Sequence, residues 1–406
     1  MPRMRRREFL NLTALATGGA LLASRLTLAA ADAGKSRLVL VIMRGALDGL
    51  AAVPPCGDPD YAQLRREFAL RAPGQVGGAL PLDGFFALHP SLNFLQQCYA
   101  ARELAVLHAL ASPYRERSHF DGQDVLENGS PRPHALQTGW LNRALAAAPR
   151  TGRSEAGVAL GQSVPLVMRG SAAVTSWSPS KLVALDDDTL ARIIGLYAGD
   201  PLLSRRLADA MAAEAIASGE GGGVTAGAAA SGANNARYAA LVRAAAGFLR
   251  RDDGARVAVF DTTGWDTHAN EGGAEGQLAG RLAALDAGLA TLKEQLGSAW
   301  HHTAVLIVTE FGRTAAINGT RGTDHGTGTA AFLVGGAVAG GRVIADWPGL
   351  SARALYQRRD VAPTLDLRSV LKGLLAEHLA VPPRALERVV FPDSAAAKPL
   401  RDLVRG

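Results

Sequence analysis

The sequence predicts an α/β fold, in which helices cover both faces of one large, mostly parallel sheet. Residues 304–308 form a continuous apolar run that ends in polar and glycine residues, as parallel strands buried on both faces do. Similar runs extend from near residue 37 to past residue 332, which favours a single sheet with insertions. Leucines in the segment 276–296 recur at spacings of four and three residues, so this segment is predicted to be a helix on the sheet.

Five strands and four main helices are predicted from runs of this kind. The strands lie at 37–43, 104–110, 256–260, 304–308 and 329–334, and the main helices at 91–101, 118–128, 276–296 and from about 365 to 378, with a further helix at 236–250. Residues 32–406 are predicted to form one domain, with a peripheral insertion and a flexible Gly/Ala-rich linker at about 170–236. Shorter strands at 164–168 and 172–177, and helices between 189 and 215, are expected in this peripheral region.

The first 31 residues are predicted to be a twin-arginine signal peptide, read by the twin-arginine export machinery. They contain the pair Arg6 and Arg7, an apolar stretch over 12–28 and small residues at 29–31. A membrane anchor is the alternative, although the apolar stretch is short and interrupted by glycine. The segment holds five arginines and one glutamate, so its removal lowers the formal net charge from +6 to +2. We therefore expect a periplasmic or secreted protein.

The composition of the chain argues against two classes of function, nucleic-acid binding and membrane spanning. The 406 residues are 48% hydrophobic with a mean hydropathy of +0.07, which is ordinary for a globular protein with a large core. No basic stripe interleaves with aromatic residues, so no nucleic-acid partner is expected. After the signal segment no run of about 18 apolar residues occurs, so no stable membrane span is expected after cleavage.

Several histidines and cysteines have structural interpretations. His108 lies inside an apolar run and is predicted to be a core histidine, whereas His378 is predicted to lie on the surface of the last helix. Cys56 and Cys98 match no metal-binding spacing, and both a disulfide and two free thiols stay open.

Ser118 has two interpretations. It begins a predicted helix, and Asp121 three residues later completes a capping box, so its role could be structural. Alternatively, a hydroxyl at a helix N-terminus beside Arg115 and Arg117 could attack an anionic ester whose charge the helix and the guanidinium groups stabilise.

Acidic and histidine residues follow four predicted strands, and we expect them to meet at one edge of the sheet. Carboxylates and imidazoles together suit zinc, manganese or iron, and so many costly polar groups at one edge indicate a functional site. Asp48 also has a simpler interpretation as a turn residue before Gly49. The candidates are Asp48, Asp266 with His268, Glu310, and Asp324 with His325, and Arg313 is a candidate anion ligand.

Five motifs closely resemble the family of domain of unknown function 1501. They are Arg-Gly-Ala-Leu-Asp-Gly at 44–49, Arg-Ser-His-Phe at 117–120, Gly-Trp-Asp-Thr-His at 264–268, Thr-Glu-Phe-Gly-Arg-Thr at 309–314 and Gly-Thr-Asp-His-Gly at 322–326. That family is similar to the alkaline phosphatase and sulfatase superfamily. The resemblance implies an alkaline phosphatase-like three-layer sandwich, with two divalent metals at the strand ends of a mostly parallel central sheet.

The resemblance also implies roles for individual residues. The metal ligands would be Asp48, Asp266, His268, Glu310, Asp324 and His325, and the catalytic groups Ser118, His119, Arg117 and Arg313. Two positions depart from the superfamily pattern. Only Thr267 separates Asp266 from His268, where three residues are usual, and Phe311 follows Glu310, where a histidine is usual.

The function implied is that of an exported metal-dependent hydrolase of phosphate or sulfate esters. Its cofactor would be one or two divalent ions, with zinc, manganese or calcium as candidates, and its nucleophile Ser118 or a metal-bound water. Its substrate would be an anionic ester of a small molecule or a polysaccharide. The alternative is a non-catalytic family member that binds an anionic or carbohydrate ligand, or a partner protein, in the periplasm.

Overall fold

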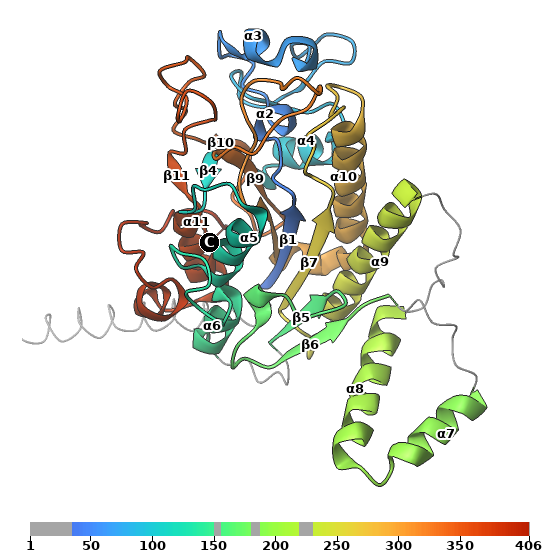
Figure 1. Ribbon diagram of the computed structural model, residues 1–406. Coiled ribbons are helices and arrows are strands. Elements are labelled where there is room, and N and C mark those ends of the chain that lie inside the picture. Colours follow the sequence, from blue (N-terminus) through green and yellow to red (C-terminus); the bar gives the residue numbers. More distant parts are fainter. Residues whose placement is uncertain (1–34, 150–155, 180–186, 219–229, 406) are drawn as a thin grey trace, which may run out of the picture.

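A nine-stranded sheet organises the molecule (Figure 1), in the order β10-β4-β9-β8-β1-β7-β5-β6, with β11 paired to β4. The computed structural model describes residues 35–149, 156–179, 187–218 and 230–405. Within this sheet β9 runs antiparallel to its neighbours β4 and β8, and the other pairs are parallel. The strands are β1 (Arg37–Arg44), β4 (Leu104–Ala111), β5 (Gly157–Leu160), β6 (Val174–Trp177), β7 (Val257–Thr263), β8 (Thr303–Thr309), β9 (Thr329–Val334), β10 (Arg342–Ile344) and β11 (Leu365–Asp366).

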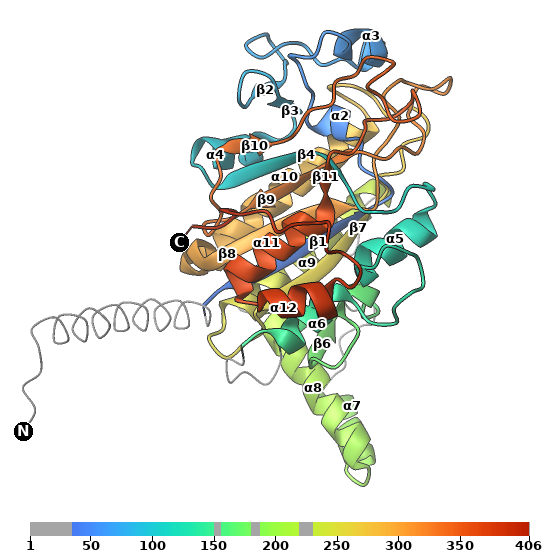
Figure 2. The same ribbon diagram turned by 90° about the vertical axis from the view of Figure 1, so that its left-hand side faces the viewer.

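Side chains of β1 alternate between two hydrophobic cores, one on each face of the sheet. Val39, Val41 and Met43 pack in the core under α4 (Asn93–Ala100), α9 (Ala230–Arg250) and α10 (Gln277–Leu296). Leu38, Leu40 and Ile42 pack in the opposite core, under α6 (Trp140–Ala147) and α11 (Leu367–Leu379). Figures 1 and 2 show these helices on the two sides of the strands. The predicted three-layer α/β sandwich is therefore confirmed, and burial on both faces explains the continuous apolar runs.

Helix α10 shows how the sequence pattern produces this packing. Its leucines at 278, 282, 285, 289 and 292 are all buried against the sheet. Full burial of one leucine side chain stabilises a fold by roughly 1.5–3 kcal/mol, so this stripe fixes the helix on the sheet.

The peripheral region differs from its prediction in two places. Residues 164–168 are not a strand, because Pro165 leads into a short 3₁₀ helix, η2 (Leu166–Met168). Helix α9 begins at Ala230, inside the predicted linker, as the high helix propensity of alanine allows. The predicted strand at 172–177 is confirmed by β6, and α7 (Asp187–Tyr197) and α8 (Pro201–Ser218) extend away from the sheet in Figure 1.

Two predicted segments lie outside the described residues, namely the signal peptide at 1–31 and the central part of the linker at 219–229. None of the helices that the structure describes is both long and apolar enough to span a membrane.

The histidine and cysteine predictions have mixed outcomes. His108 is a buried core histidine, as predicted, and its Nε2 lies 3.0 Å from the Val53 carbonyl oxygen. The surface prediction for His378 is wrong, because α11 packs against the sheet and buries this side chain, with Nε2 2.8 Å from the Arg37 carbonyl oxygen. Cys56 and Cys98 are both free thiols.

The reversed direction of β9 brings the loops of the sheet together. Strands β1, β4, β7 and β8 run in one direction, so their carboxyl ends share one edge. Since β9 runs the opposite way, its amino end, and the loop that leads into it, lie at that same edge. Four loops that are far apart in sequence therefore meet there.

Candidate metal centre

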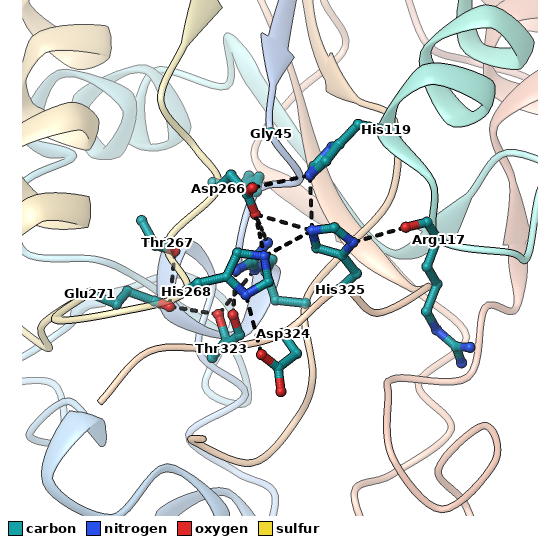
Figure 3. Close-up of polar contacts among 12 residues, drawn as sticks. Gly45, Arg117, His119, Asp266, Thr267, His268, Glu271, Thr323, Asp324 and His325 are labelled. Atoms are coloured by element: carbon teal, nitrogen blue, oxygen red, sulfur yellow. Dashed lines mark hydrogen bonds and ion pairs between the residues drawn. The ribbon is translucent and has the colours of Figure 1, made fainter. Parts of the chain in front are cut away.

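Three histidines and one aspartate converge at this edge of the sheet (Figure 3). His119 is the first residue of α5 (His119–Asn128), which follows β4. Asp266 and His268 follow β7, and His325 lies in the loop before β9. The side chain of His325 is 25% exposed, so water and small ligands can reach the cluster.

The ligand atoms of these four side chains lie close together. His325 Nε2 is 2.9 Å from His119 Nε2 and 3.0 Å from His268 Nε2. Asp266 Oδ2 is 3.3 Å from His119 Nε2, and Asp266 Oδ1 is 3.0 Å from His268 Nε2 and 3.2 Å from His325 Nε2. Of the four, His119, Asp266 and His325 have ligand atoms within 4.8 Å of one another, and His268 joins them through its contacts with Asp266 and His325.

The hydrogen bonds on the other side of each ring indicate which nitrogen carries the hydrogen. Nδ1 of His119 is 2.7 Å from Glu310 Oε1, Nδ1 of His268 is 3.2 Å from Asp324 Oδ1, and Nδ1 of His325 is 2.9 Å from the Arg117 carbonyl oxygen. These oxygens are acceptors, so each Nδ1–H donates to its partner. In the neutral imidazoles each Nε2 then presents a lone pair. Those of His119 and His325 lie together with the Asp266 carboxylate, and that of His268 lies beside Asp266 and His325. Because the inward-facing Nε2 atoms carry no hydrogen, they can serve as ligands of a metal cation.

A hydrogen bond and burial shift the pKa values of His119 and His325 in opposite directions. The Glu310 hydrogen bond raises the pKa of His119, whereas burial lowers the pKa of His325. Burial raises the pKa of Glu310, but the hydrogen bonds from His119 and Gln123 outweigh it, so the pKa lies below its ordinary value. Glu310 is therefore an ionised acceptor behind His119, as outer carboxylates are behind metal-bound histidines.

Arg313 holds Asp266 in place. Its guanidinium group is buried, with Nη1 donating to Asp266 Oδ1 and Nε donating to Thr323 Oγ1 at 3.1 Å. Burial raises the pKa of Asp266, but this arginine outweighs the effect and holds the pKa below its usual value. In this structure Arg313 thus serves the cluster through Asp266, and its side chain does not point freely into the site.

Asp48 lies apart from the four converging side chains. It is 1% exposed, and its Oδ1 caps α2 (Gly49–Ala52) by accepting from the Leu50 and Ala51 amides at 2.9 and 3.0 Å. Its Oδ2 accepts from Arg65 Nη2 at 2.5 Å. These partners satisfy both oxygens, in agreement with the simpler interpretation of Asp48 as a turn residue.

Arg117 and Ser118 directly precede His119, but the Arg117 side chain turns away from the cluster and Ser118 does not cap the helix. Figure 3 shows the Arg117 guanidinium group turned away from the histidines, and its Nε and Nη2 bind Asp360 Oδ2 at 3.0 and 2.6 Å. Ser118 is the N-cap residue of α5, but its side chain makes no capping hydrogen bond. The predicted capping box is therefore wrong, and the Ser118 hydroxyl is not used to begin the helix.

Glu271 was not predicted from the sequence, although it ties together two loops of the site. It is 0% exposed, and its Oε2 accepts from Thr267 Oγ1 at 3.0 Å and from Thr323 Oγ1 at 2.6 Å. Thr267 lies between Asp266 and His268, and Thr323 precedes Asp324. Burial and the nearby Asp48 raise the pKa of Glu271 well above its usual range. The sequence around Glu271 is an ordinary polar loop, so nothing in it predicts that this side chain will bind both threonines.

Comparison with solved structures finds weak likenesses. One is the crystal structure of Ps i-CgsB in complex with k-i-k-neocarrahexaose, at 11% identity and a TM-score of 0.36, covering 76% of this chain and 68% of that one. Another is the phosphonate monoester hydrolase of Agrobacterium radiobacter, at 10% identity and a TM-score of 0.35, covering 76% and 70%. Neither likeness is strong enough to support a conclusion about function.

Sequence comparison identifies the family. No curated protein matches the chain. Residues 105–390 match the family model described as a protein of unknown function, DUF1501. This match includes β4, β7, β8 and β9 and all four converging side chains. The chain therefore belongs to the DUF1501 family.

Proposed function

We propose that this chain is an exported, metal-dependent hydrolase of phosphate or sulfate esters, in a branch of the alkaline phosphatase and sulfatase superfamily. The supporting observation is the convergence of three imidazole Nε2 atoms and the Asp266 carboxylate. Nitrogen-rich ligand sets suit zinc, manganese or iron, whereas calcium prefers oxygen ligands. The geometry supports one ion, held by His119, Asp266 and His325 with His268 beside them, because the Asp48 and Glu310 carboxylates already have other partners.

Other residues would keep this site in order. Glu310, Asp324 and the Arg117 carbonyl group orient the three rings, and Arg313 fixes the Asp266 carboxylate. A divalent metal, when bound, acts as a Lewis acid that polarises an ester oxygen and lowers the pKa of a nucleophile. Ser118 remains the proposed nucleophile, because it adjoins His119 at a helix N-terminus and its hydroxyl makes no cap.

A second function, binding of an anionic or carbohydrate ligand without turnover, is favoured by one observation. Arg117 and Arg313, the arginines expected to grip an anionic ester, both point into internal ion pairs, with Asp360 and Asp266. A binding protein could keep its metal and still lack hydrolytic activity.

Metal content tests the centre itself. The mature protein, purified without chelator after native export, is expected to contain about one equivalent of a transition metal by inductively coupled plasma mass spectrometry. The double variant Asp266→Ala, His325→Ala is expected to lose it. The variant His301→Ala changes an exposed histidine in the 3₁₀ helix before β8 and is expected to keep it. A metal-free wild-type protein would exclude the proposed centre.

Activity separates the two functions. With the metal present, hydrolysis of 4-nitrophenyl phosphate or 4-nitrophenyl sulfate supports the hydrolase, and absence of turnover on aryl and sugar esters of both acids favours the binding protein. In an active enzyme, Ser118→Ala is expected to reduce kcat by at least about 100-fold without changing metal content. Ser298→Ala, at an exposed serine, is the matched control. Unchanged turnover in Ser118→Ala would remove Ser118 from the mechanism.

A further inference from the structure

A cavity lies at the carboxyl end of β7, between α9 and α10. Its volume is about 120 Å³, and the residues that line it include Arg237, Tyr238, Asp261, Trp265 and Arg281. It shares no lining residue with the four side chains of the metal centre. Trp265, however, directly precedes Asp266, so the two sites are neighbours along the chain.

The guanidinium group of Arg281, which lines this cavity, makes only one weak hydrogen bond. Its Nε is buried and has no hydrogen-bond partner, and its Nη1 makes one long contact, 3.4 Å to the Thr263 carbonyl oxygen. Burial lowers the pKa of Arg281. A partly buried positive charge is costly unless a negative group compensates it, so an anion bound in the cavity would stabilise this side chain.

The backbone is shaped to admit this guanidinium group. Gly264 has a φ of +90°, and a Cβ atom there would lie 2.3 Å from Arg281 Nη1. A side chain at position 264 would therefore displace the arginine and strain the turn. This explains the glycine that begins the Gly-Trp-Asp-Thr-His motif, a feature that the metal centre does not account for.

The cavity carries an excess of positive charge. Neither Arg281 nor Arg237 forms an ion pair with another residue that the structure describes. Asp261 also lines the cavity, but its Oδ2 already accepts from Arg44 Nε at 2.6 Å. Two cationic side chains thus line the cavity, together with one carboxylate whose charge is shared with Arg44.

We infer that this cavity is a binding site for a small tetrahedral oxyanion, sulfate or phosphate, with Arg281 and Arg237 as its ligands. A cavity of about 120 Å³ has room for several water molecules, and therefore for an ion of five heavy atoms. Planar guanidinium groups are well matched to such oxygens. The inference does not depend on the metal centre, since it uses none of its residues.

Isothermal titration calorimetry with inorganic sulfate and inorganic phosphate tests the site in the purified mature protein. Arg281→Gln is expected to weaken binding by about tenfold or more, as loss of a charged hydrogen bond does, and Arg237→Gln should weaken it to a smaller extent. Arg243→Gln changes an exposed arginine on the same helix α9, outside the cavity, and is expected to bind like the wild type. Phenyl phosphate and phenyl sulfate distinguish a free anion from an ester group.

A variant that lacks metal ligands shows whether anion binding depends on the metal centre. In the double variant Asp266→Ala, His325→Ala the oxyanion is expected to bind with wild-type affinity, whether or not the wild type holds a metal. Loss of binding in that background, or unchanged affinity in Arg281→Gln, would overturn the inference, as would an absence of heat with both anions at about 10 mM. Should Arg281→Gln fail to fold, Arg237→Gln, at an exposed side chain, still decides the question.

Discussion

Glu310 is a positioning residue for His119, and its removal should weaken metal binding. Its Oε1 accepts from the His119 ring at 2.7 Å and from the Gly45 amide at 2.9 Å, at a site that is 1% exposed. Loss of such an outer carboxylate typically costs 10- to 100-fold in metal affinity, so Glu310→Ala is expected to lose about that much in a zinc competition assay. Glu310→Gln keeps an acceptor oxygen and should lose less.

The hydrogen bond between Glu310 and His119 can also be tested without metal, through the pKa of His119. Because the Glu310 hydrogen bond raises the pKa of His119, the Glu310→Gln variant should show a lower His119 pKa in an NMR titration of the metal-free protein. Glu294→Gln, at an exposed glutamate on α10, should leave that pKa unchanged. A wild-type His119 pKa in Glu310→Gln would show that this carboxylate does not control the ring.

At the residue scale, the sequence predicted which residue types gather but not which way each side chain points. Asp266, His268 and His325 follow strand ends, and the structure brings them together. Asp48 also follows a strand, yet Arg65, from the short helix α3 (Tyr61–Arg65), binds its carboxylate. The local sequence does not show which distant residue will pair with a side chain. The sequence could therefore identify Asp48 and Arg313 as site candidates, but it could not predict that they bind Arg65 and Asp266.

Glu271 joins the loop after β7 to the loop before β9, so its loss should loosen both. In Glu271→Ala the Thr267 and Thr323 hydroxyls lose their acceptor, which costs about 1–3 kcal/mol for each buried group. Hydrogen exchange measured by mass spectrometry is expected to rise in residues 264–271 and 318–326, together with weaker metal binding.

Glu271→Gln provides the informative comparison. Burial and Asp48 raise the pKa of Glu271, so near neutral pH a protonated carboxyl group and a neutral amide are nearly equivalent. This variant should resemble the wild type at pH 7, and Glu275→Ala, at an exposed position in the same loop, should as well. Fast exchange in Glu271→Gln would instead mean that the ionised carboxylate holds the loops.

At the element scale, burial on both faces made the central strands predictable. The runs that became β1, β4, β8 and β9 are apolar except for His108 and residues at the strand ends, because helices cover each face of the sheet. Shorter elements carry weaker patterns. The apolar residues at 166–168 form a 3₁₀ helix, and the four-residue strand β5 was not predicted.

At the scale of the whole molecule, the location of the site followed from the fold class, but the strand order did not. Parallel strands end at one edge, which is enough to predict that their polar loops meet. The antiparallel direction of β9 and its place between β4 and β8 depend on pairing between distant segments. The sequence of a single strand does not encode its neighbours, so this topology required the structure.

Burial of His108 and His378 makes the stability of the whole fold depend on pH. Burial lowers the pKa of each to about 4, whereas both titrate near 6.5 in the unfolded chain. Below pH 6.5 the unfolded chain binds more protons than the folded protein, so stability is complete above that pH and declines as pH falls towards 4. His378 alone should account for a loss of about 2 kcal/mol in the free energy of unfolding between pH 7.5 and 5.

The variant His378→Gln isolates this contribution. Glutamine does not titrate and can still donate to the Arg37 carbonyl group that His378 Nε2 contacts at 2.8 Å. In urea titrations followed by circular dichroism, the variant should be less stable than the wild type at pH 7.5 but should lose about 2 kcal/mol less on acidification. His301→Gln, at an exposed histidine, controls for general effects of charge. Equal acid sensitivity of wild type and His378→Gln would mean that His378 keeps an ordinary pKa in the folded protein.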